Sequence, residues 1–96
     1  MSAAVGLLTL EIYIPGVTSL KEKRALIKPI IARIRHEFNV SVAEVSDMDQ
    51  LGHMVIGVAA VSPSADYAHG LLERVAQAIE AWRLDAELVD YSIEML

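Results

Sequence analysis

Cysteine is absent from this chain of 96 residues, and aromatic residues make up only 5% of it. Without cysteine the chain has no disulfide framework, no thiol nucleophile and no thiolate metal site. No window approaches the roughly 18 apolar residues that span a bilayer, and the first residues lack the basic start of a secretory signal. These features predict a cytoplasmic protein that does not enter a membrane.

Apolar residues are abundant instead. They make up 54% of the sequence, against 22% charged residues and a net charge of −5. This composition argues against disorder. A chain of this length forms one domain, here 1–96, which buries about 60 to 65% of the surface of its unfolded form. The sequence contains no repeat, linker or low-complexity segment.

The hydrophobic period divides the chain into six elements. β-Branched and aromatic residues predict a strand over 5–15, which ends at the turn pair Pro15-Gly16. A helix follows to Phe38, and Ser19 with Glu22 has the spacing of a capping box. Strands over 40–47 and 53–62 form a hairpin, a second helix runs to about residue 83, and a last strand covers 86–96.

Two prolines carry specific predictions. Pro29 lies inside the first helix, where it removes the backbone hydrogen bond to Ala25, so we expect a kink there. Ser62-Pro63 is typical of an N-cap followed by proline at the first helical position, so the second helix is predicted to begin there.

The order βαββαβ predicts a ferredoxin-like α+β sandwich, with an antiparallel sheet in the order 4-1-3-2 and both helices on one face. The other face of the sheet then has no helical cover. Its apolar side chains, together with Leu88, predict a homo-oligomer, most simply a dimer. The alternative is that loops or the chain end cover this face. The predicted oligomer face comprises Leu7, Tyr13, Val55, Ala59 and Val61.

The segments "SLKEKR" after "IYIPG", "FNVSVAEV" and "IGVAAVS" resemble the YlxP-like bacterial family, a domain of unknown function. The resemblance spans nearly the whole chain and implies the same ferredoxin-like fold. Genes of this family tend to lie among genes for translation initiation and ribosome maturation, which implies a connection to RNA or the ribosome. The hairpin loop "SDMDQLGHM" departs from the aromatic and basic residues expected of the family there.

Positive charge is concentrated in the first helix. Residues 19–38 hold six basic and two acidic residues, a net charge of +4, whereas the rest holds two basic and eleven acidic residues, a net charge of −9. Sorted charge focuses an electrostatic field, so this helix is a candidate strip for RNA or an acidic protein. Simple solvation of a surface helix is the alternative. On a helical projection, one stripe holds Lys21, Arg24, Lys28 and Arg35.

The amino end of the same helix is a second candidate anion site, because free backbone N–H groups favour an anion there. Lys21 and Lys23 are close to it. The competing interpretation is that Ser19 and Glu22 already satisfy these groups as a capping box. The anion or RNA site predicted from the sequence therefore comprises Lys21, Lys23, Arg24, Lys28 and Arg35.

Enzymatic chemistry has little support in the sequence. The turn "PGVTSLK" has no arginine of the kind that acylphosphatases of this topology use, and the central strands lack the aromatic platform of an RNA-recognition motif. Asp47, Asp49 and His53 lie in one hairpin loop, where aspartates more often serve turn geometry than metal binding. We expect no catalytic residues, no metal and no cofactor, while any small-molecule ligand stays open.

The sequence thus predicts a binding module, with an RNA or ribosome connection through the basic helix. The alternative is a structural or regulatory homo-oligomer that associates through its open sheet face.

Overall fold

The structure, a computed structural model, describes residues 2–82 and 84–96. Strand β1 (Ala4–Tyr13) leads into helix α1 (Leu20–Glu37), which is followed by the hairpin of β2 (Ser41–Ser46) and β3 (His53–Ser62). Helix α2 (Ala65–Ala81) and strand β4 (Glu87–Met95) complete the chain. The predicted order βαββαβ is confirmed.

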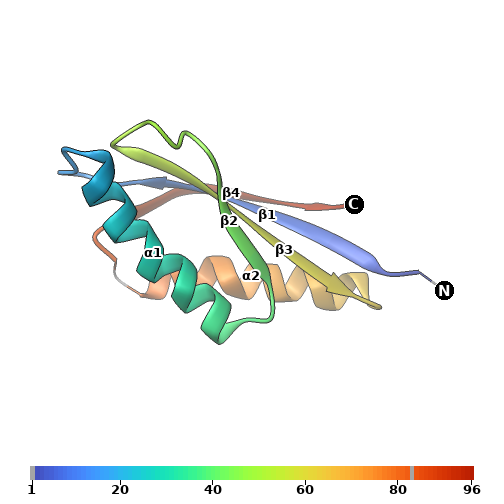
Figure 1. The fold of residues 1–96 in the computed structure, drawn as a ribbon. Helices are drawn as coiled ribbons and strands as arrows, with labels where there is room; N and C mark the ends of the chain where they lie inside the picture. Colours follow the sequence, from blue (N-terminus) through green and yellow to red (C-terminus); the bar gives the residue numbers. More distant parts are fainter. Residues whose placement is uncertain (1, 83) are drawn as a thin grey trace.

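The four strands form one antiparallel sheet in the order β2-β3-β1-β4. This is the predicted order read from the other edge. Both helices cover the same face of the sheet, and the opposite face has no helix over it (Figure 1). The ferredoxin-like arrangement is therefore confirmed, and β2 and β4 are its two edge strands.

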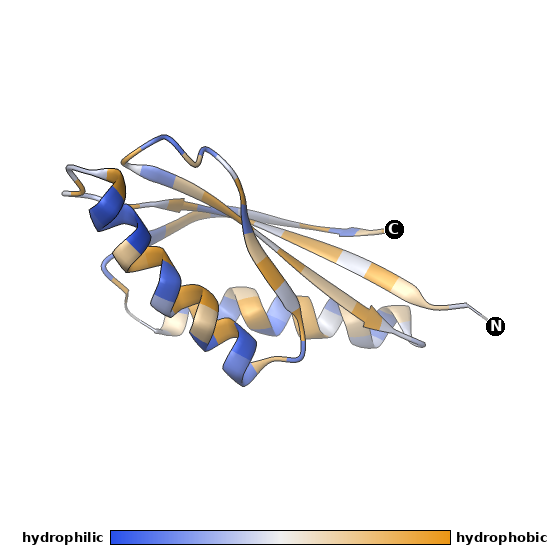
Figure 2. Cartoon of the chain, in the orientation of Figure 1, coloured by the Kyte–Doolittle hydropathy of each residue, from blue (hydrophilic) through white to orange (hydrophobic). Residues whose placement is uncertain are grey.

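The core lies between the sheet and the helices. Along β1, Leu8, Leu10 and Ile12 are buried, as the alternation of the strand requires, and apolar residues of both helices pack over them. Figure 2 shows hydrophilic and hydrophobic residues alternating along α1, whereas β1 and β3 are largely hydrophobic. The helical period of α1 thus gives it one buried side and leaves charge on the others.

The helix starts differ in detail from the predictions. Ser19 is the N-cap of α1 and accepts a hydrogen bond from Glu22 N, but the Glu22 carboxylate bonds to Thr18 instead of returning to Ser19. The N-cap of α2 is Ser64, not Ser62, so Pro63 precedes the cap and is not the first helical residue. Two serines flank Pro63, and the sequence pattern did not distinguish them.

A bulge in β4 changes which side chains of that strand face the helices. The register between β1 and β4 shifts between Glu11 and Ile12, so that Leu88 pairs with Ile12 and packs against the core. Val89 is left outside the pairing and is 59% exposed. The expectation that Leu88 joins the open face is therefore wrong, because strict alternation does not hold across a bulge.

Candidate functional site

The basic residues of α1 fall into two groups, those that hold the fold together and those that face solvent. Lys23 belongs to the first group, because its side chain is only 1% exposed. Its Nζ donates a hydrogen bond of 2.7 Å to the carbonyl of Asp47 and lies 3.1 Å from Oε2 of Glu44. Although Lys23 was included in the predicted anion site, this ammonium group already has partners inside the protein.

The contact between Lys23 and Glu44 is an ion pair without the geometry of a hydrogen bond. Oε2 of Glu44 is shielded from solvent, and no donor within the described residues meets it in hydrogen-bond geometry. A buried carboxylate oxygen is costly without compensation, and the ammonium group of Lys23 supplies a compensating positive charge. The pair ties α1 to β2 and to the hairpin loop.

Arg35 also has a structural role. Its guanidinium donates a hydrogen bond of 2.9 Å to the carbonyl of Val42 in the edge strand β2. An edge strand presents backbone groups that can pair with another chain, and a charged side chain lying on them blocks such pairing. Arg35 keeps its positive charge and its remaining N–H donors, so it still contributes to the field of the helix.

Arg33 lies on another side of α1, toward α2. Its guanidinium carbon is 4.1 Å from the centre of the Trp82 ring, and its Nε lies 3.3 Å from a carboxylate oxygen of Glu37. These contacts give Arg33 a cation–π partner and an acidic partner. Arg33, which the helical projection places outside the basic stripe, is therefore committed to contacts within the protein.

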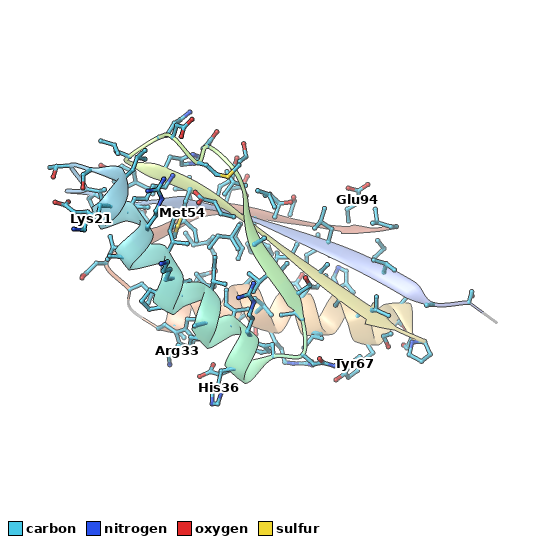
Figure 3. The ribbon with its side chains drawn as sticks, viewed as in Figure 1. Lys21, Arg33, His36, Met54, Tyr67 and Glu94 are labelled. Atoms are coloured by element: carbon cyan, nitrogen blue, oxygen red, sulfur yellow. The ribbon has the colours of Figure 1, made fainter. Side chains whose placement is uncertain are left out.

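The other three basic residues of α1 form what we call the cationic flank, which consists of Lys21, Arg24 and Lys28. All three are exposed, and none forms an ion pair with a residue that the structure describes. Figure 3 shows Lys21 at the amino-terminal end of α1, pointing away from the sheet. The structure thus brings together three of the five predicted anion-site residues as exposed cations, with Arg35 farther along the same stripe.

The amino end of α1 is occupied by a carboxylate of the protein itself. Glu22 accepts hydrogen bonds from the backbone N–H and the hydroxyl of Thr18, at 3.0 and 2.9 Å. These bonds hold the pKa of Glu22 below its ordinary value of 4.5, with the backbone bond the larger cause. The structure therefore favours the capped interpretation of this helix end over an anion site.

The predicted oligomer face is uneven in its exposure. On this side of the sheet Val61 is 70% exposed and Tyr13 is 47% exposed, whereas Leu7 and Ala59 are half-buried. Val55 is 8% exposed, because Glu11 and Ser46 flank it in the neighbouring strands. The sequence reasoning missed Val45, the extra residue of a bulge in β2, which is 52% exposed and lies over Gly57.

The hairpin loop is organised around Asp47, which has a positive φ of 58°. One of its carboxylate oxygens lies 2.7 Å from Nδ1 of His53, and its carbonyl accepts from Lys23 and from the backbone N–H of Gln50. The described residues contain no group of three or more potential ligands that could hold a metal ion. Asp47 therefore serves the turn and its attachment to α1.

Within the described ranges, neither helix has the length and apolarity to cross a membrane. Residues 5–93 match the family described as a protein of unknown function, DUF503. The chain belongs to this family. It is also similar to the uncharacterized protein YlxP of Bacillus subtilis (strain 168), with 37% identity over 78 residues that cover 81% of this chain and 85% of that protein. The predicted resemblance to the YlxP-like family is thereby confirmed.

Proposed function

We propose that this DUF503 protein is a cytoplasmic binding module and not an enzyme, and that its cationic flank holds the backbone phosphates of RNA, free or within the ribosome. The observation that carries the proposal is that only some of the basic residues of α1 are paired with carboxylates. Lys23 and Arg33 have carboxylate partners, whereas Lys21, Arg24 and Lys28 have none among the described residues.

The geometry of the flank suits a charged backbone. Seven residues of helix separate Lys21 from Lys28, or about 10 Å along the axis, and Arg35 extends the line to about 21 Å. The open sheet face supplies no competing platform, because β3 has no aromatic residue and β1 has only Tyr13. Binding through phosphates alone predicts little preference for base sequence.

The salt dependence of RNA affinity tests this proposal. Fluorescence anisotropy with a labelled single-stranded RNA, over a series of KCl concentrations, should give a slope of log affinity against log salt of about −2 for three phosphate contacts, or about −3 when Arg35 adds a fourth. The triple variant K21Q/R24Q/K28Q should lose most of this slope, and its thermal unfolding should match that of the parent because all three side chains are exposed.

A matched pair of single variants supplies the control. Arg24 and Arg74 are both exposed arginines, but Arg74 lies on α2 beside Tyr67. R24Q should reduce RNA affinity and lower the slope by somewhat less than one, whereas R74Q should leave both unchanged. If the two variants behave alike, or if the parent binds no RNA at low salt, the charges of α1 serve solvation and the proposal fails.

A second candidate function is homo-oligomerisation through the open sheet face, favoured by the exposure of Val61, Val45 and Tyr13 there. Light scattering of the purified protein at tens of micromolar decides it. A dimer that V61K converts to a monomer supports this function, and the matched control is Y67K, which alters an exposed apolar residue on α2. Val55 is unsuitable for this test, because a lysine at so buried a position would disturb folding.

A further inference from the structure

The flank of α1 away from the cationic flank borders a groove. Its wall on the helix side includes Ala25, Leu26, Pro29 and Ile30, and residues 84–86 form the opposite wall. The hollow has a volume of about 370 Å³ and a largely apolar lining. A second hollow shares Ala25, Leu26 and Asp85 with it and extends past Glu22 to the turn at Pro15 and Gly16. Because they share these residues, the two hollows adjoin each other along α1, and we call them together the groove.

The groove and the cationic flank are separate surfaces. With about 100° of rotation per residue, counted from Leu20, the cationic flank lies at about 40 to 100° around the helix. Glu22, Ala25, Pro29 and Arg33 lie at about 140 to 220° on the same projection. Substitutions can therefore change one surface without changing the other.

Three charged residues border the groove within the described part of the chain. Asp85 borders both hollows, Glu22 borders the outer one and Arg33 borders the inner one. The positive charge of Arg33 is offset by Glu37, and its guanidinium stacks on the ring of Trp82. Among the described residues, Asp85 has no ion-pair partner, so the charge left on the rim of this apolar groove is negative. Such a groove complements a ligand that has both an apolar side chain and a cation.

Pro29 interrupts the backbone hydrogen bonds of α1 beside this groove. Proline has no backbone N–H, so the carbonyl of Ala25 lacks the donor that residue 29 supplies in an uninterrupted helix. Both Ala25 and Pro29 are exposed and line the groove. The two residues therefore contribute apolar surface to its wall.

We propose that this groove docks a short segment of a partner protein in which a large apolar side chain stands next to a lysine or arginine. The apolar side chain packs against Leu26, Pro29 and Leu84, and the cation faces Asp85. This inference concerns a protein partner and is independent of RNA binding at the cationic flank.

Nuclear magnetic resonance with defined peptides tests the inference. The isotope-labelled full chain is titrated with acetyl-Gly-Leu-Leu-Lys-Gly-amide, and separately with peptides in which glutamate replaces lysine or glycines replace the leucines. We expect chemical-shift changes centred on Ala25, Leu26, Ile30 and residues 84–86. The lysine peptide should bind about threefold more tightly than the glutamate peptide, the effect of one exposed ion pair, and the glycine peptide should not bind.

Two variants connect the preference to the groove. D85N should abolish the preference for lysine over glutamate, whereas D49N, which removes an exposed aspartate in the hairpin loop, should keep it. The triple variant K21Q/R24Q/K28Q should bind the lysine peptide as the parent does, which separates this result from the outcome for RNA.

Three results would overturn the inference. The first is the absence of localised shift changes at peptide concentrations up to about 10 mM. The dissociation constant would then exceed that concentration, and the affinity would be too weak for a docking site. The second is equal loss of preference in D49N and D85N. The third is a change in the groove signals when the protein is diluted without peptide, because the occupant is then a second copy of this chain.

Discussion

At the scale of single residues, the least expected feature is the burial of Lys23. A lysine is almost never fully buried unless it is paired, and a helical pattern does not show which cation has a carboxylate across from it. Glu44 comes from β2, and Asp47 from the loop after it, so the pairing depends on the packing of α1 against the hairpin. Sequence reasoning therefore placed Lys23 among the anion-site residues, and the folded structure uses it internally.

Replacing Lys23 should strongly destabilise the fold. K23M leaves the shielded oxygen of Glu44 without a counter-ion and should lower the free energy of unfolding by about 3 kcal/mol. The double variant K23M/E44L removes both charges and should recover most of that loss, because well-packed apolar residues often replace a buried ion pair without cost. Urea denaturation of the two variants and the parent measures the difference. Equal stabilities of K23M and the parent would show that the pair contributes nothing.

Glu22 gives the protein a pH-dependent contribution to stability. Its pKa is lowered in the folded state by the hydrogen bonds from Thr18, so its ionised form favours folding. That contribution is present above the unfolded-state pKa and is lost as the pH falls through the lower folded-state pKa. E22Q keeps an acceptor oxygen but removes the charge. Its melting temperature should lie below that of the parent at pH 7, and the difference should disappear as the pH falls below the folded-state pKa of Glu22. A difference that stays constant as the pH is lowered would contradict the assignment.

At the scale of elements, the sequence predicted the strands and helices whose burial follows a regular hydrophobic period. The prediction was wrong where a β-bulge interrupts that period. The strand alternation of Leu8, Leu10 and Ile12 and the helical period of α1 sufficed for the fold, because burial follows these periods directly. The bulges at Val45 and Val89 shift the register by one residue, and nothing in the amino-acid pattern marks them. The groove beside α1 also escaped prediction, because segments far apart in the sequence form its walls.

The proline inside α1 carries an element-scale prediction. The helix continues through Pro29 from Leu20 to Glu37, and the kink expected there stays a prediction. P29A restores the backbone hydrogen bond to the Ala25 carbonyl, so the thermal unfolding midpoint should rise. The gain is about 2 kcal/mol, which is about 3 for removing the proline less about 1 for the greater freedom of the unfolded chain. Calorimetry measures the midpoint. A clear fall would mean that the helix needs the proline to seat over the sheet.

At the scale of the whole molecule, the structure separates three surfaces around one small core. The cationic flank lies on one side of α1 and the groove on another. The open sheet face lies on the side of the sheet away from both helices (Figure 1). A protein with a net charge of −5 thus presents opposite charges on two sides of a single helix. The RNA and the peptide segment proposed above would occupy different surfaces, so the two proposals can be tested independently.

Arg35 and Arg24 provide a test of how this molecule divides its charge between folding and binding. The predicted stripe treated the two as equivalent, but only Arg35 bonds to the backbone of the edge strand. R35Q should lower the melting temperature and promote aggregation, because the Val42 carbonyl is then open to pairing with another chain. R24Q should change neither property while reducing RNA affinity at low salt. Thermal scans with light scattering measure the melting temperature and the aggregation, and anisotropy titrations on fresh portions of the same preparations measure the RNA affinity. If R35Q melts and stays dispersed as the parent does, the bond to Val42 neither holds α1 to β2 nor protects the edge.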